Sequence, residues 1–255
     1  MGRPAGALLF ARFAYPPNEL GYCGPDESAA LLEHVSEGVA DGDLSRLARG
    51  FAGAWPYLQL IAGMNGIADP LDVRVVEAYW VGNPMLHRVG PAAFGRSLED
   101  RFQDRTGRSF SRLVEAVPAG ALPHHSFHVF GVYPWVGLLR SGSVDHALHV
   151  LDRCRIRWGR VDAIVGDRAV VQSQPLEWDG RRLLLGTARA EQATIGVNGR
   201  SLVPQLAVGD WCALHWDWVC DRLSPERLAA LRSYSEGQLA VVNSLAVPAP
   251  ATVLS

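Results

Sequence analysis

The chain has 255 residues, of which 48% are hydrophobic and 20% are charged, and its net charge is -2 with neutral histidines. This is the composition of a globular protein that is long enough to bury a sizeable core in one or two domains. It lacks the basic excess that suits nucleic acid or an acidic membrane surface. All 24 cationic residues are arginines, which excludes Schiff-base chemistry and the lysine of phosphate-binding loops.

The N-terminal segment has an apolar run too short for a secretion signal, and no run elsewhere approaches about 18 apolar residues. We therefore expect a cytoplasmic protein. The four cysteines are then expected to be thiols, because reducing compartments disfavour structural disulfides; they are Cys23, Cys154, Cys212 and Cys220. No two of them form a CxxC pair, which argues against a zinc ribbon or a dithiol redox site.

The first half of the chain is predicted to be helical. Residues 10–28, FARFAYPPNELGYCGPDES, are the exception, because aromatics, a double proline and GYCGP predict a loop-rich stretch. Apolar residues at helical spacing then predict further helices. These cover residues 26–38, 43–66, 69–83, 91–104, 126–142 and 144–153.

The period of the apolar residues changes to two at Cys154, which predicts short strands. They cover residues 155–164, 168–178, 181–190 and 210–218, with Gly-Asp or Asp-Gly turns at 166–167, 179–180 and 209–210. Ser224 and Pro225 then open a helix over 224–243. The sequence thus predicts an α+β protein with three parts, a helical domain (1–151), a small β-barrel with a C-terminal helix (152–244) and a tail (245–255).

Two stretches of the second half resemble the HypC/HupF family of NiFe-hydrogenase maturation chaperones. The first, CRIRWGRVDAIVGDRAVV, begins with Cys154, followed five residues later by a glycine and then by a Gly-Asp turn. The second, VGDWCALHWDWVCDRLSPERLAAL, has a Gly-Asp-aromatic strand with His215 six residues after Gly209, then Arg222-Leu223 before a helix. The resemblance covers roughly residues 152–240.

This resemblance implies an OB-like barrel that carries an iron of the Fe(CN)2CO type. Such a protein exchanges the iron with a HypD-like partner and delivers it to the hydrogenase large subunit. Cys154 and His215 fall on the family's ligand positions, and a thiolate with an imidazole suits low-spin iron. Metal–ligand bonds of about 2.0–2.3 Å predict that the two ligand atoms lie on the order of 3–5 Å apart. Trp216 and Trp218, on one face of the strand beside His215, are expected either to pack in the barrel or to wall the site.

The helical half carries a possible second metal site. In LPHHSFHVF, His124 and His128 have i, i+4 spacing, so a regular helix places them on one face and His125 elsewhere. Cys23, between two glycines of the loop-rich stretch, is a third candidate ligand. The alternative is a helix start with partly exposed histidines. The segments YPPNELGYCGP and PHHSFHVF also resemble an uncharacterised bacterial family associated with hydrogenase gene neighbourhoods, which implies the same pathway for this half.

Three functions remain open at this point. The leading one is a metallochaperone without turnover, which acts through protein–protein interaction and holds iron at Cys154 and His215. The second is a metal-dependent enzyme with a site at His124, His128 and Cys23 that makes or handles a diatomic ligand. The third is a metal-free adaptor, in which Cys154 is a small buried residue and His215 a core histidine.

Overall fold

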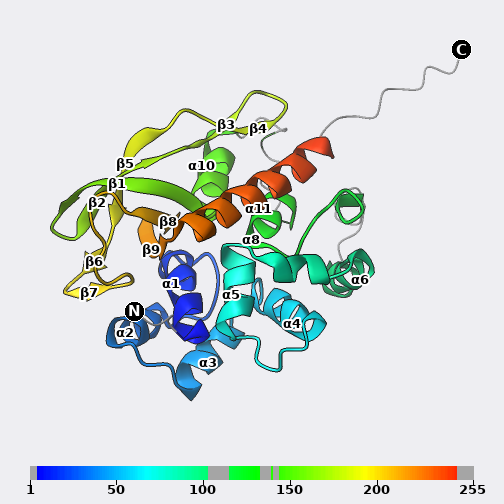
Figure 1. Ribbon diagram of the computed structural model, residues 1–255, viewed down its shortest axis with the longest axis horizontal. Helices are drawn as coiled ribbons and strands as arrows, with labels where there is room; N and C mark the ends of the chain where they lie inside the picture. The colour runs from blue at the N-terminus through cyan, green and yellow to red at the C-terminus, as the bar shows by residue number, and fades with distance from the viewer. Residues whose placement is uncertain (1–4, 103–114, 133–138, 140–143, 246–255) are drawn as a thin grey trace, which may run out of the picture.

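The computed structural model describes residues 5–102, 115–132, 139 and 144–245, and its first half is helical (Figure 1). The helices are α1 (Gly6–Glu19), α2 (Ser28–Glu37), α3 (Gly42–Arg49), α4 (Trp55–Met64), α5 (Val73–Trp80), η1 (Pro84–Arg88), α6 (Pro91–Phe102), α8 (His125–Phe127), η2 (His128–Val132) and α10 (Val144–Cys154). The predicted helical half is therefore confirmed. The ends of the predicted helices at 103–104 and 133–142 lie outside the described residues, except for residue 139.

Helix α1 corrects the prediction of a loop over residues 10–28. The helix continues through Pro16 and Pro17 to Glu19, and only the rest of the stretch up to residue 27 is non-helical. Tertiary packing outweighs the low helix propensity of proline here, because Phe10 and Phe13 are fully buried. The helix packs against α2, α3 and α5 and also against the sheet.

The second half is built on a five-stranded sheet. Its strands are β1 (Arg157–Val165), β2 (Arg168–Ser173), β5 (Arg189–Thr194), β8 (Trp211–His215) and β9 (Trp218–Leu223). They pair in the order β1-β2-β5-β9-β8, and β8 pairs in turn with β1. All of these pairings are antiparallel except the link between β5 and β9, which is a single parallel pair of Thr194 with Trp218.

Two small hairpins extend from this sheet. The strands β3 (Leu176–Trp178) and β4 (Leu183–Leu185) form the first, which confirms the turn predicted at 179–180. The strands β6 (Gly196–Val197) and β7 (Arg200–Ser201) form the second, which the sequence did not predict. Neither hairpin belongs to the five-stranded sheet.

The C-terminal helix α11 (Pro225–Ser244) lies between the sheet and the helical half (Figure 1) and contacts β1, β9, α8 and η2. It begins as predicted, since the Ser224 hydroxyl accepts a hydrogen bond from the backbone N–H of Arg227. One hydrophobic core runs through both halves and includes Phe13, Leu214 and Leu231. The domain boundary at 151/152 stays a prediction.

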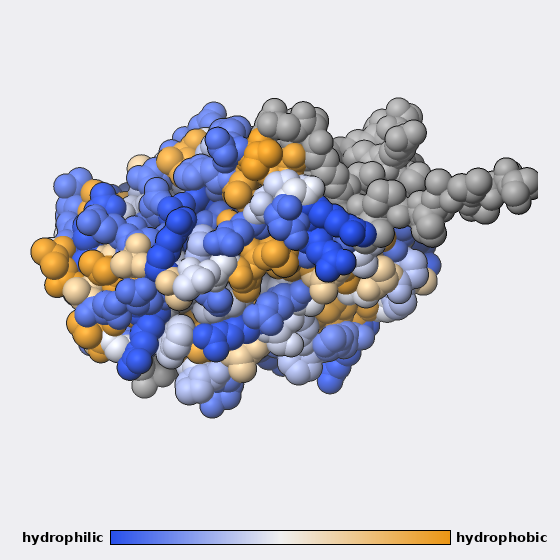
Figure 2. Space-filling model, turned by 90° about the horizontal axis from the view of Figure 1, so that it is seen from above, coloured by the Kyte–Doolittle hydropathy of each residue, from blue (hydrophilic) through white to orange (hydrophobic). Residues whose placement is uncertain are grey.

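The surface seen in Figure 2 carries hydrophilic side chains over most of this face, with hydrophobic ones in small separate groups. In the part of the chain that the structure describes, no helix is both long enough and apolar enough to cross a bilayer. Of the predicted tail, residues 246–255 lie outside the described residues.

Candidate metal centre

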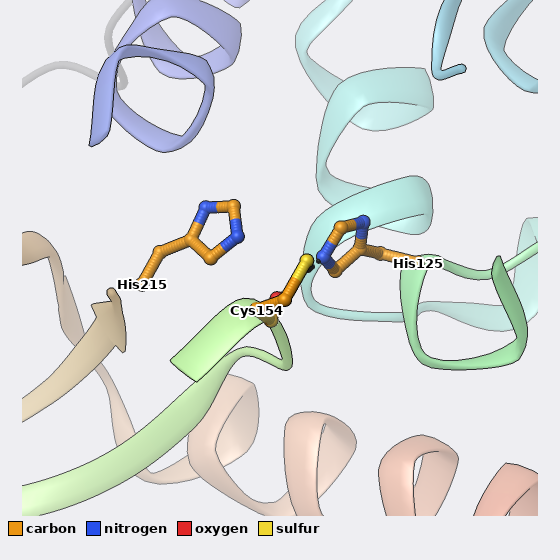
Figure 3. Close-up of side chains that lie close together, drawn as sticks. All are labelled: His125, Cys154 and His215. Atoms are coloured by element: carbon orange, nitrogen blue, oxygen red, sulfur yellow. Dashed lines mark hydrogen bonds between the residues drawn. The ribbon is translucent and has the colours of Figure 1, made fainter. Parts of the chain in front are cut away.

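Three potential metal ligands from distant parts of the chain meet at the junction of the two halves (Figure 3). They are His125 at the start of α8, Cys154 at the end of α10 and His215 at the end of β8. One ligand atom from each lies within 4.8 Å of the other two. The predicted approach of Cys154 to His215 therefore falls in the expected range, and His125 adds a third donor.

A buried arginine holds two of the contributing elements together. Arg157 at the start of β1 is 1% exposed, and it donates hydrogen bonds to the carbonyls of Asp152 (3.1 Å) and Arg153 (3.3 Å) in the last turn of α10. It also donates to the carbonyl of Trp216 (2.6 Å) directly after β8. An ion pair with Glu191 (3.2 Å) compensates its buried charge. The end of α10 is thereby fixed beside the end of β8.

His215 presents one ring nitrogen to the site. Its Nδ1 donates a hydrogen bond to the backbone carbonyl of Phe13 in α1 at 2.6 Å. Burial, followed by the proximity of His125, lowers the pKa of His215 well below its usual value, so the ring is neutral and its proton sits on Nδ1. Nε2 then carries a lone pair, and it is buried without a hydrogen-bond partner among the described residues.

His125 engages both of its ring nitrogens. Nε2 donates to the backbone carbonyl of Cys154 at 2.8 Å, and Nδ1 lies 3.3 Å from the hydroxyl of Tyr79. Burial lowers the pKa of His125 to about 4, so this ring is also neutral near pH 7. Moving its proton from Nε2 to Nδ1 would turn Tyr79 into the acceptor and release Nε2 for a metal ion.

The Cys154 thiol is protonated in this arrangement. Its burial, and secondly the proximity of Cys23, raises the pKa of Cys154 above its usual value. In Figure 3 its sulfur lies between the two imidazole rings. Since the thiolate is the form that binds metal, an ion entering the site has to displace this proton.

A cavity of about 300 Å³ adjoins the three ligands. Besides them, its lining includes Cys23, His128, Pro17, Tyr79, Trp80 and Trp216. Tyr22 and Trp216 stack at its edge with ring centroids 4.3 Å apart. The cavity thus joins parts of the two sites that the sequence predicted separately.

The predicted grouping of His124, His128 and Cys23 is not found among the described residues. His124 precedes α8 in an extended conformation, accepts a hydrogen bond from Ser126 and does not line the cavity. His128 lines the cavity, with its Nδ1 3.3 Å from the hydroxyl of Tyr57. The i, i+4 argument fails because α8 begins only at His125 and passes into the π-helix η2, so the spacing of a regular α-helix does not apply.

Of the two tryptophans expected to pack in the barrel or to wall the site, Trp216 walls it and Trp218 does not. Trp216 lies in the turn after β8 with a φ of 51°, and it lines the cavity. Trp218 opens β9 and packs edge-on against Tyr15 with centroids 5.2 Å apart, outside the cavity. Cys212 in β8 and Cys220 in β9 are fully buried.

Sequence reasoning missed His125, Tyr79, Phe13 and Arg157. For His125 a signal was present, because two adjacent histidines point to different sides of a helix and one of them can face the site. The other three carry no local signal, since their roles depend on elements distant in the chain.

The donor set of the candidate centre is two imidazoles and one thiolate. This set suits zinc, iron or copper, while the absence of a carboxylate from the group disfavours calcium and magnesium. Three protein donors leave at least one coordination position open, as in sites where a metal ion binds a further ligand. That position has room in the adjoining cavity.

Comparison with known proteins identifies a family. Residues 2–249 match the model of DUF6390, described as a family of unknown function, and the chain therefore belongs to this family. The match spans both the helical half and the sheet. No curated protein and no solved structure matches the chain.

Proposed function

We propose that this member of the DUF6390 family is a metal-binding assembly factor. It holds one ion through His125, Cys154 and His215 and passes it to a partner protein without catalytic turnover. The observation that carries this proposal is the buried Nε2 of His215, which has no hydrogen-bond partner in the described part of the chain and lies next to a thiol and a second imidazole. A buried ring nitrogen without a partner costs free energy, and a metal ion in this position removes that cost.

Iron is the proposed ion. The sheet order supports the OB-like part of the proposal. The third strand along the chain, β5, pairs with the fifth, β9, as in the Greek-key barrel of that fold. The HypC/HupF resemblance supplies Cys154 and His215, and His125 from the helical half adds a donor that this resemblance lacks. Three protein donors leave three positions on a six-coordinate iron, as many as two cyanides and one carbonyl occupy. A HypD-like protein and the hydrogenase large subunit are the proposed partners.

Metal content and infrared spectra of the protein from its native host test this proposal. We expect about one iron per chain, with bands in the cyanide and carbonyl stretching region. Cys154→Ala should lose the metal and the bands, whereas Cys212→Ala is the matched control, since Cys212 is a buried thiol outside the three-ligand group. Metal without these bands would overturn the Fe(CN)2CO assignment. A wild-type protein that holds no metal, even after incubation with Fe²⁺ or Zn²⁺, would overturn the metal site and favour the adaptor.

A metal-dependent enzyme is the second candidate, favoured by the cavity of about 300 Å³ beside the three ligands. The cavity has room for a small substrate at an open metal position. Cys23 and His128 line it without belonging to the three-ligand group. On this alternative, Cys23→Ala and His128→Ala abolish turnover and leave the metal content unchanged. On the assembly-factor proposal, neither substitution prevents delivery of the iron.

A further inference from the structure

The carbonyl that holds His215 is unusual within its own helix. In an α-helix the carbonyl of residue 13 accepts the N–H of residue 17, or that of residue 16 where the turn tightens. Here these residues are Pro17 and Pro16, which have no N–H. The Phe13 carbonyl therefore has neither of its helical donors, and the ring of His215 donates to it at 2.6 Å.

We propose that Pro17 is a positioning residue for His215. Because it lacks the N–H that would bond the Phe13 carbonyl in a regular α-helix, it keeps this carbonyl available to accept from Nδ1, which directs the lone pair of Nε2 toward Cys154 and His125. The link to metal binding rests on the proposed function, whereas the choice of tautomer is a property of the metal-free protein.

Burial strongly favours the Nδ1–H tautomer of His215. Phe13 is 0% exposed and His215 is 1% exposed, so water does not replace a missing partner for either group. In the other tautomer, the lone pair of Nδ1 would face the carbonyl oxygen, placing two acceptors 2.6 Å apart. An N–H at residue 17 would share this oxygen, which can accept two hydrogen bonds, and would thereby weaken the preference for the Nδ1–H tautomer.

The end of α1 is held in place, so the carbonyl cannot easily move away from the ring. The side chain of Asn18 donates to the carbonyls of Cys23 (2.7 Å) and Pro25 (2.6 Å), which anchors the loop after the helix. Trp218 at the start of β9 donates to Glu19 at 3.2 Å. The helix end is thereby attached to the strand that follows His215.

The two prolines offer a matched pair of variants. In Pro17→Ala the restored N–H points to the Phe13 carbonyl, whereas in Pro16→Ala it points first to the carbonyl of Arg12, which serves no metal ligand. Both variants exchange one buried proline for alanine at adjacent positions of α1, although only Pro17 also lines the cavity. The tautomer measurement therefore comes before the affinity measurement. Circular dichroism establishes that each variant is folded.

Nitrogen-15 NMR of the histidine rings in the metal-free protein tests the tautomer. We expect His215 of the wild type to be protonated on Nδ1, Pro17→Ala to populate the Nε2–H form measurably, and Pro16→Ala to resemble the wild type. Zn²⁺ titration then tests the consequence. Affinity should fall about tenfold or more in Pro17→Ala, as when other partners that orient metal ligands are removed, and less than threefold in Pro16→Ala.

Each outcome bears on one of the two claims. An Nε2–H tautomer in the wild type overturns the positioning role even if no variant folds. The same holds for a Pro17→Ala protein with an unchanged tautomer. A changed tautomer with unchanged Zn²⁺ affinity would leave the positioning of the ring standing and overturn its effect on metal binding. If Pro17→Ala changes the tautomer but the wild type binds no Zn²⁺, positioning of the ring stands and the metal-binding proposal fails.

Discussion

The two histidines of the candidate centre differ in how ready they are to bind a metal ion. His215 comes from the sheet side and His125 from the helical side. On the sheet side, His215 has one nitrogen bonded to the Phe13 carbonyl and the other free of hydrogen bonds among the described residues. On the helical side, His125 has partners at both nitrogens, one of them the carbonyl of Cys154. The sheet side can thus accept a metal ion as it stands, whereas the helical side first has to move a proton. The hydrogen bond to Phe13 therefore holds His215 in the form that binds metal.

The largest expected effect is the loss of metal affinity when Cys154 is removed, because among the three ligands it alone binds metal as an anion. We expect Cys154→Ala to weaken metal binding at least a hundredfold, because the two remaining donors are neutral imidazoles. Loss of a small half-buried side chain should lower the free energy of unfolding by only about 1–2 kcal/mol. Metal titration and urea unfolding of the metal-free protein measure the two effects. Cys23→Ala is the control and should bind metal like the wild type; equal, mild effects of both substitutions would count against the site.

The next largest effect should come from the arginine that fixes the sheet side. Arg157→Met leaves Glu191 with Arg153 as an ion-pair partner and Ser173 as a hydrogen-bond donor, and it removes the donor to the Trp216 carbonyl. We expect the free energy of unfolding to fall by about 3 kcal/mol, because the carboxylate of Glu191 loses a buried partner that compensates its charge. Urea unfolding measures this change, and Zn²⁺ affinity should fall as well. Adding Glu191→Gln should restore part of the stability but not the affinity; recovery of both would show that Arg157 only neutralises a charge.

The buried histidines predict a stability that depends on pH. Burial lowers the pKa of His125 to about 4 and that of His124 to about 3, while in the unfolded chain both titrate near 6.5. Between these values the unfolded state binds protons that the folded state excludes, so stability is lost as the pH falls from about 6.5 to 4. For His125 alone the loss is about 3 kcal/mol. Urea unfolding of the metal-free protein at pH 7, 5.5 and 4.5 tests this, and a stability that stays constant over the range would contradict it.

The smallest effect concerns the proton that has to move on the helical side. Tyr79→Phe removes the acceptor for Nδ1–H of His125, so metal affinity should fall about tenfold. Tyr57→Phe removes the corresponding contact of His128, which lies outside the three-ligand group, and should leave affinity unchanged. Zn²⁺ titration of both variants compares them directly. Equal affinities would mean that His125 binds without the help of Tyr79.

Much of the fold follows from local patterns. The change of period at Cys154 marks the end of α10 and the approach to the sheet, and the glycine turns at 166–167 and 179–180 mark two hairpins. The loop prediction over residues 10–28 holds for residues 20–27 and is wrong up to Glu19, because the local sequence contains two prolines but does not show the burial of Phe10 and Phe13. The Phe13 carbonyl, which lacks its helical donors, receives a hydrogen bond from His215 in β8 instead. A pattern within residues 10–28 cannot predict this partner.

In the site, too, only part of the arrangement follows from the sequence. The family resemblance predicts that Cys154 and His215 lie close together, and it covers the sheet, where strand register fixes which residues are neighbours. His125 was misplaced because the histidine pair at 124–125 was assigned to a regular helix, while the start of α8 and the π-turn after it depend on packing. Arg157 is polar and lies at the start of a strand, so the local pattern does not predict its burial. It is buried because the end of α10 lies against it and accepts its hydrogen bonds.

The contact between the Phe13 carbonyl and the His215 ring has a consequence for the order of events during synthesis. The two residues are 202 positions apart, so the ribosome releases the helix that carries the carbonyl long before the strand that carries the ring. A contact of such sequence separation forms late in folding. A nascent chain that meets a metal ion early has at most His125 and Cys154 to offer. The complete three-ligand group exists only after β8 has been synthesised, so on the proposed function metal loading follows translation.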